Sequence, residues 1–257
     1  MPERDSWSVY IETAADSVRQ EHMEVKQECE AFKRFCQRIR TLETQIPQIT
    51  QPSFRTQQIR SFSEQSVRDV IELCYRETVM AVDHYEQVYG NSFGDEISAE
   101  FGNNVAVLIL EATLLSPLLK QRLLQAAQQC INSRRIFLKT LEDEQNTLKA
   151  AHSTCQKIQQ TLFSNEDNSL NTLSNRRLIE QYESIRSLDD ECEKWLHRRQ
   201  QQIHDRRSTN STKGEYRVLC PYLYTSLDVT YPILTIFVIL HEQLQTRKQQ
   251  IFRSYIR

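Results

Sequence analysis

Glycine and proline are scarce in this sequence, which has four glycines and six prolines among 257 residues. Gln, Glu, Arg and Leu are abundant instead, a composition typical of helical and coiled-coil proteins. No alternating apolar and polar stretch of strand length is present, and no internal repeat occurs. The sequence therefore predicts an all-α fold.

Long apolar runs are also missing. The longest, YPILTIFVIL at 231–240, is far shorter than the ~18–20 residues that cross a bilayer, so no transmembrane segment is predicted. The first residues, MPERDSWSVY, are charged and lead directly into a helical pattern, so a secretory signal is not expected and the predicted location is cytoplasmic. The alternative ranked last is that the tail at 231–257, which is apolar and ends in basic residues, associates with a membrane surface. Peripheral membrane contact is therefore not expected.

The sequence holds seven cysteines, an odd number, and no CxxC. Disulfide scaffolds are usually short, secreted and even in cysteine number, so we predict reduced and mostly buried thiols. His22, Cys29 and Cys36 share a helical stripe, but successive members lie about 10 Å apart and cannot jointly hold one zinc ion. No Glu-x-x-His pair of helical di-iron proteins is present.

No nucleophile motif, Walker A sequence or dinucleotide fingerprint occurs. We therefore predict no catalytic residue, no cofactor and no metal, which favours a protein without enzymatic activity.

Charge is nearly balanced overall but unevenly distributed. The net charge is −2, and the arginine pairs are flanked by acidic residues, so nucleic-acid binding is not predicted. Residues 54–115 carry four basic and ten acidic side chains, a net charge of −6, whereas the remainder carries +4. Docking of this acidic lobe beside basic helices of the same chain explains the asymmetry, and a site for a cation or a basic partner is the alternative.

Three long helices are predicted at 6–46, 117–163 and 174–207. The first has an apolar residue every seven positions, and Ser116-Pro117 is a strong start for the second. Polar links at 164–175 and 207–215 separate these helices from a tail at 216–257 that should form one or two helices. The heptad residues of the first helix are Ile11, Val18, Val25, Phe32, Ile39 and Ile46.

The stretch 73–102 is the least generic part of the chain, because it contains three of the four glycines. Ser61 and Glu64 have capping-box spacing ahead of a helix that should end at Gly90. A short helix is expected at 95–101 with Gly102 just past its end, followed by a fully buried short helix at 105–115. These elements form the predicted short-helix lobe at 54–115.

The glycine-rich corner of this lobe is the candidate interaction or ligand site. Its candidate residues are Arg76, Glu77, His84, Tyr85 and Tyr89. His84 and Glu77 lie about 10 Å apart on one helix, too far for an acid–base pair, but His84 could find a partner on another helix. Arg76 and Glu77 could form a buried ion pair.

The segments YRETVMAV and HYEQVYG, the continuation to GNSFGDEISAEFG and the later LLSPLLKQRLL resemble a family of uncharacterised proteins from halophilic archaea. The first helix and the C-terminal LYTSLDVTYPIL are similar to that family as well, so the resemblance covers most of the chain. It implies no activity and transfers no functional residue.

Together these observations predict an all-α, elongated antiparallel bundle of three long helices in a single domain at 1–257. The short-helix lobe would lie at one end, and the C-terminal helix would pack back on the bundle. We expect a protein–protein interaction or scaffolding protein that binds a protein partner or self-associates. The alternative is a small-ligand-binding or regulatory domain, or an unrecognised enzyme, with its site at 76–102.

Overall fold

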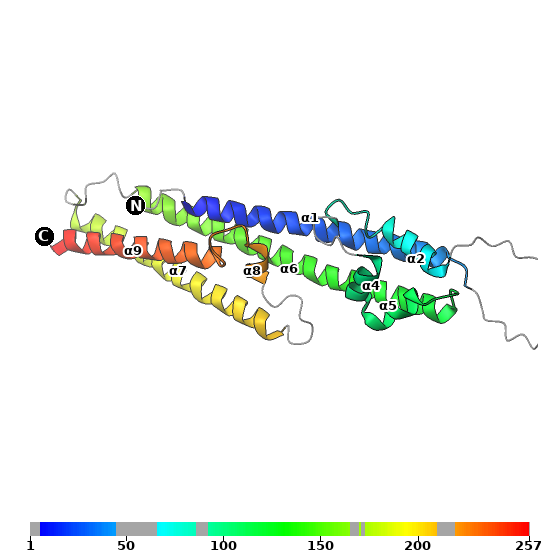
Figure 1. The fold of residues 1–257 in the computed structure, drawn as a ribbon. Helices are drawn as coiled ribbons and strands as arrows, with labels where there is room; N and C mark the ends of the chain where they lie inside the picture. Colours follow the sequence, from blue (N-terminus) through cyan, green and yellow to red (C-terminus); the bar gives the residue numbers. More distant parts are fainter. Residues whose placement is uncertain are drawn as a thin grey trace, which may run out of the picture. The chain divides into compact units, whose positions relative to one another are not determined.

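The computed structural model describes residues 6–44, 66–85, 92–164, 170, 173–209 and 219–256. All regular structure in these ranges is helical, and no strand occurs in them, which confirms the all-α fold class and the packing of long helices in a bundle (Figure 1). The helices are α1 (Ser6–Thr41), α2 (Val67–Arg76), α4 (Phe93–Phe101), α5 (Asn103–Leu110), α6 (Pro117–Ser164), α7 (Asn175–Thr209), α8 (Leu219–Leu223) and α9 (Pro232–Ile256).

The chain divides into two compact units, which are described separately. Unit 1 comprises residues 1–21 and 142–257, and unit 2 comprises residues 22–141. Helices α1 and α6 each contribute residues to both units.

The core of unit 2 is aromatic. Tyr75 of α2 packs edge-on against Phe35 of α1 at 5.4 Å and against Phe93 of α4 at 5.7 Å between ring centroids. The ring of Phe101 on α4 lies against those of Phe35 and Tyr75, with centroids 6.1 and 6.0 Å away. The apolar seam predicted for the first helix is the face that supplies Phe32 and Ile39 to this core.

Helix α2 begins with a capping box at Ser66 and Asp69, a pairing that the sequence analysis missed. The predicted box at Ser61 and Glu64, and the predicted stop at Gly90, lie outside the described residues.

The prediction of one continuous helix beyond Arg76 is wrong. The hydroxyl of Thr78 donates to the carbonyl of Cys74 at 2.6 Å, and the amides of Thr78, Val79 and Met80 all converge on the carbonyl of Tyr75. Three amides thus share one carbonyl in place of the regular i to i−4 series, and the chain continues as turns.

Gly102 connects α4 to α5 with φ +80° and ψ 153°, a conformation that favours glycine. Its predicted position at the end of α4 is confirmed. The prediction that the next helix is fully buried is wrong, because α5 ends at Leu110 and leaves Val107 and Leu108 half exposed while Ala106 and Ile109 are buried.

The start predicted for the second long helix is confirmed. The Ser116 hydroxyl accepts from the amide of Leu119 at 3.1 Å, and Pro117 takes the first helical position. In the same turn, the ammonium group of Lys120 donates to the carbonyls of Arg40 and Leu42 at 2.7 and 2.6 Å, so α6 caps the C-terminal end of α1 within unit 2.

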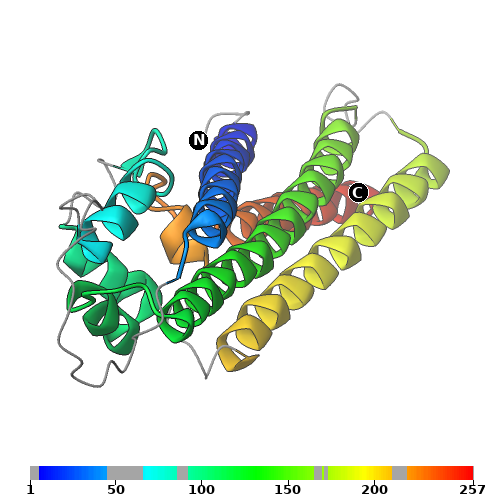
Figure 2. The same ribbon diagram turned by 90° about the vertical axis from the view of Figure 1, so that its right-hand side faces the viewer.

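In unit 1, α7 and α9 lie side by side and run antiparallel (Figure 1 and Figure 2). The rings of Trp195 and Phe237 stack with centroids 5.0 Å apart, and Gln245 bonds Asp189 at 2.8 Å. A residue further along α7 therefore faces a residue earlier in α9, as expected for an antiparallel pair. These two contacts define the register of the helices.

The seven cysteines are free and buried, as predicted. Burial raises the pKa of Cys155 and of Cys192 to about 12. The thiols therefore pack as small apolar groups. Among the described residues, no helix combines the length and the hydrophobicity needed to cross a membrane.

Candidate functional site

Of the residues predicted for the glycine-rich corner, Arg76, Glu77 and His84 each pair with a different residue, while the charge of Arg76 also acts on Tyr85. Arg76 is exposed and pairs with Glu72 of its own helix at 2.7 Å. Glu77 is exposed too, and it pairs with Arg38 of α1. The buried Arg76–Glu77 ion pair considered above is therefore wrong. Tyr89 lies outside the described residues.

His84 and Tyr85 are buried and face partners on different helices. The Nε2 atom of His84 lies 3.0 Å from Oε1 of Glu28 on α1, which confirms that a second helix supplies its partner. Burial raises the pKa of Tyr85, and the carboxylate of Glu96 on α4 adds to this effect. The two neighbours thus tie the turns after α2 to α1 and to α4.

Arg134 of α6 is the centre of the unit-2 charge network, which we define as Glu28, His84, Glu100 and Arg134. Its Nε donates to Glu28 at 2.7 Å, and its two terminal nitrogens donate to Glu100 at 3.0 and 2.7 Å. The guanidinium carbon also lies 4.5 Å from the ring centre of Phe32. Burial alone lowers the pKa of Arg134, but the bonds and charges of Glu100 and Glu28 outweigh it and raise the pKa.

This network supports the intramolecular explanation of the acidic lobe. Glu100 lies in the acidic segment and binds a basic residue of α6, and Glu77 of the same segment binds Arg38 of α1. Each hydrogen-bonding nitrogen of Arg134 already has a carboxylate oxygen, so the network holds three elements of unit 2 together.

Unit 1 contains a second buried group, the unit-1 charge cluster of Glu144, Arg199 and Tyr224. Glu144 of α6 and Arg199 of α7 are 0% and 2% exposed, and two hydrogen bonds join them, one of 3.0 Å from Nη1. The hydroxyl of Tyr224 donates to the same carboxylate at 2.7 Å, and burial raises the pKa of this tyrosine. The cluster therefore fastens the residues after α8 to α6 and α7.

A third polar contact joins α7 to α9. The buried carboxylate of Asp189 lies 2.7 Å from Nδ1 of His241 and 2.7 Å from the ammonium nitrogen of Lys248. Gln245 lies between His241 and Lys248 on the same face of α9, and its side-chain amide also donates to Asp189. In the part of the chain that the structure describes, no group of three or more His, Cys, Asp or Glu side chains is placed to hold a metal ion.

The sequence analysis missed these charged clusters, although a signal for them existed. Glu144 interrupts the apolar stripe of α6 between Leu141 and Leu148, and Arg199 continues the stripe of α7 one turn after Trp195. A charged residue at a stripe position is either exposed or paired inside. The pattern alone does not say which residue of another helix completes the pair.

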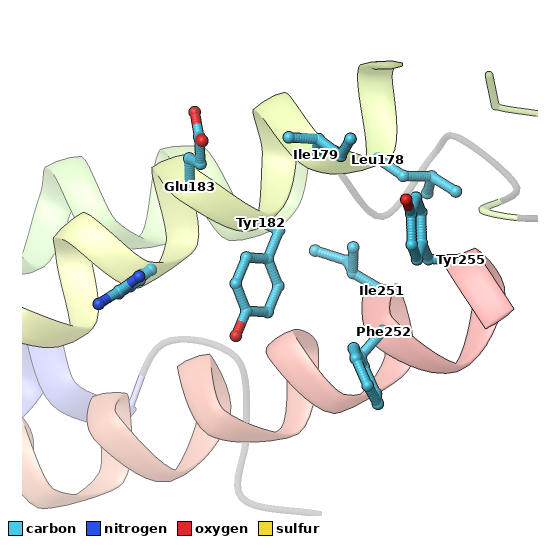
Figure 3. A pocket seen from close by; sticks show the side chains of 8 residues that line it. Leu178, Ile179, Tyr182, Glu183, Ile251, Phe252 and Tyr255 are labelled. Carbon is cyan, nitrogen blue, oxygen red and sulfur yellow. The ribbon is translucent and has the colours of Figure 1, made fainter. Parts of the chain in front are cut away.

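An apolar groove in unit 1, the α7–α9 groove, is a cavity of about 330 Å³ between the first turns of α7 and the last turns of α9. Tyr182 and Ile251 point toward one another across it, and Phe252 lies at the α9 edge (Figure 3). Phe252 is 56% exposed and Ile179 is 46% exposed. The groove is lined by Leu178, Ile179, Tyr182, Glu183, Arg186, Ile251, Phe252 and Tyr255.

Both walls of the groove follow from helix geometry. Leu178, Tyr182 and Ile185 recur at helical spacing on α7, and Ile251 and Tyr255 recur four residues apart on α9. Nearer the middle of the pair, the same stripes are covered by each other and are buried. At this end Leu178 and Ile251 are buried too, and the exposed apolar side chains are Ile179 and Phe252, which flank the two stripes, together with Tyr255.

Comparison with known proteins gives one result for the chain as a whole. A family model described as a domain of unknown function (DUF7260) matches residues 9–248. The chain belongs to this family. No curated protein and no solved structure matches it.

The DUF7260 match covers the unit-2 charge network and the unit-1 charge cluster completely. It also covers the α7 wall of the groove, but it ends at Lys248, three residues before Ile251. The α9 wall of the groove therefore lies beyond the matched region.

Proposed function

We propose that this DUF7260 protein is a non-enzymatic, cytoplasmic interaction protein whose contact surface for other protein is the α7–α9 groove. The observation that carries this proposal is the set of large apolar side chains left exposed around one cavity, Ile179, Phe252 and Tyr255. Contiguous exposed apolar surface of this kind marks interaction sites, and aromatic residues are enriched in them.

The buried charges support the same assignment. The side chains with the chemistry of acids, bases and electrophiles, such as Glu144, Arg199 and Arg134, are occupied with one another inside the two units. The alternative of a small-ligand or catalytic site at 76–102 requires side chains that converge on one space. Arg76, Glu77 and His84 each bind a different partner instead.

Affinity capture from the native host tests the proposal. On the family resemblance, we propose a halophilic archaeon as that host, so the capture is done at the salt concentration of its cytoplasm. Apolar contacts persist at such concentrations, whereas exposed charge pairs are screened over about 3 Å at 1 M salt. The bait is the full chain, and its Phe252→Glu variant removes the aromatic edge of the groove.

Ile136→Glu provides the matched control, because Ile136 is an equally large, exposed apolar residue on α6 and is not part of the groove. We expect the wild type and Ile136→Glu to retain the same proteins and Phe252→Glu to lose them. Equal retention by all three baits would refute the groove as the contact surface.

A further inference from the structure

The interior of unit 1 contains two cysteines from different helices, Cys155 of α6 and Cys192 of α7. Both are 0% exposed, and each lies on the buried stripe of its helix. Cys155 follows Glu144 by eleven residues, and Cys192 precedes Arg199 by seven, so each cysteine points within about 20° of the direction of that charged residue. Because Glu144 and Arg199 are hydrogen-bonded to each other, the two thiols leave their helices in the directions that bring those side chains together.

Two contacts between α6 and α7 fix the level of the cysteines along the helices. One is the buried ion pair of the unit-1 charge cluster, and the other is the pair of Lys157 with Glu191 at 3.2 Å. In the antiparallel arrangement that these contacts define, Cys155 and Cys192 both lie between them, and each is within two residues of the second contact. Two residues correspond to about 3 Å of helix rise, so the cysteines lie at nearly the same level.

An electrostatic effect agrees with this placement. The charge of a Cys192 thiolate adds to burial in raising the pKa of Cys155, and such an effect falls off with distance. The third cysteine of unit 1, Cys220, lies elsewhere, because its sulfur is 3.4 Å from Nη2 of Arg199 and about 10 Å of helix rise separates Arg199 from Cys192. Cys155 and Cys192 are therefore the cysteines of this unit that are placed to react with each other.

We propose that Cys155 and Cys192 are a redox modification site, at which a disulfide joins α6 to α7 when the surroundings become oxidising. The oxidant is a small-molecule disulfide. One cysteine attacks it and forms a mixed disulfide with release of one small thiol, and the second cysteine attacks the mixed disulfide and releases the other. The two cysteines give up two electrons and two protons, which leave on the two molecules of small thiol.

Burial determines when this exchange takes place. With a pKa of about 12, each thiol carries little thiolate at neutral pH, and neither sulfur is accessible to a reagent in the folded chain. Exchange therefore occurs on the newly made chain or during opening of unit 1, and the finished bond is shielded from reductants once the unit closes. The bond also closes a loop around the 36 residues 156–191, which restricts the unfolded chain and stabilises unit 1.

Refolding in a glutathione redox buffer tests the proposal, because exchange is fast before the thiols are buried. The reduced full chain is unfolded in urea, diluted into reduced and oxidised glutathione, and blocked with an alkylating reagent, and the same mixture with the urea retained gives the unfolded reference. Mass spectrometry of proteolytic fragments identifies the linked cysteines. We expect the link between Cys155 and Cys192 to be at least about tenfold more abundant after refolding than in urea, because a bond that stabilises the fold is favoured by the fold to the same extent.

Cys192→Ala should abolish the link, whereas Cys36→Ala, which changes a buried thiol of unit 2, should leave it unchanged. The oxidised chain should also unfold at a temperature about 5 °C or more above that of the reduced chain. A link no more abundant after refolding than in urea, another cysteine pair that dominates after refolding, or a lower unfolding temperature of the oxidised chain overturns the inference. Capture of proteins by the α7–α9 groove does not depend on this bond, so such a result leaves the proposed function intact.

Discussion

At the scale of single residues, burial sets the chemistry of the titratable groups. Cys155 and Cys192 have a pKa of about 12 in the folded chain, compared with an ordinary value of about 9. Burial also raises the pKa of Tyr75 and Tyr224. These groups remain protonated in the folded state at a pH where the unfolded chain has lost their protons.

The first prediction follows from the sign of these shifts. Above about pH 9 the unfolded chain binds fewer protons than the folded chain, so the free energy of unfolding decreases as pH rises. Each shifted thiol contributes at most about 1.4 kcal/mol per pH unit between about pH 9 and 12. Urea unfolding between pH 8 and 11 measures the slope, and Cys155→Ala/Cys192→Ala should make it shallower. Identical slopes for the two proteins would show that these thiols do not titrate in this manner.

The second prediction concerns the unit-1 charge cluster. Arg199→Met leaves the carboxylate of Glu144 buried without its counter-charge and should lower the free energy of unfolding by about 3–5 kcal/mol. Adding Glu144→Leu removes the remaining buried charge and should recover most of that loss. Urea denaturation gives both values. A double variant as unstable as the single one would contradict the assignment of the loss to an uncompensated charge.

At the scale of elements, the short connection between α4 and α5 depends on a single residue, Gly102. A methyl group added there would meet nothing within 4 Å, yet its φ of +80° is strained for any other residue. Gly102→Ala should therefore cost about 1–3 kcal/mol of unfolding free energy through backbone conformation alone.

Gly94 offers the matched comparison within α4. A methyl group there would contact a side-chain atom of Leu110 at 3.7 Å, an ordinary distance, and its backbone is helical. Gly94→Ala should leave stability unchanged or raise it by up to about 1 kcal/mol. Thermal unfolding of the two variants measures both changes, and equal losses would contradict the assignment of the Gly102 loss to its backbone conformation.

Helix bounds were the part of the structure most accessible from the sequence, because local signals determine them. Ser116 and Pro117 mark the start of α6, and a glycine-free, proline-free pattern carries it to Ser164. The end of α2 at Arg76 was missed because apolar residues such as Val82 and Tyr85 keep helical spacing through the turns that follow it.

The candidate site was less accessible because its contacts join residues far apart in the sequence. The sequence left open a partner for His84 on another helix, but it does not indicate that Glu28, 56 residues earlier, is that partner. The groove was missed for a related reason. A stripe at helical spacing predicts an apolar face, and it does not indicate that Ile179 and Phe252, each next to a buried stripe residue, form an exposed apolar edge around a cavity.

At the scale of the whole molecule, each unit has its own core and its own buried charges. The unit-2 charge network joins α1, α4 and α6, and the unit-1 charge cluster joins α6, α7 and the residues after α8. The proposed contact surface is a different feature, the exposed apolar side chains of Ile179 and Phe252 beside one cavity. The account of function therefore depends on the α7–α9 groove.

Photo-crosslinking from position 252 in the living host tests that claim most directly. A benzophenone amino acid replaces Phe252, which keeps an aromatic ring at the edge of the groove, and the same probe at Ile136 on α6 serves as the control. The account predicts covalent protein adducts from position 252 and few from position 136. Adducts no more abundant at position 252 than at position 136 would contradict it.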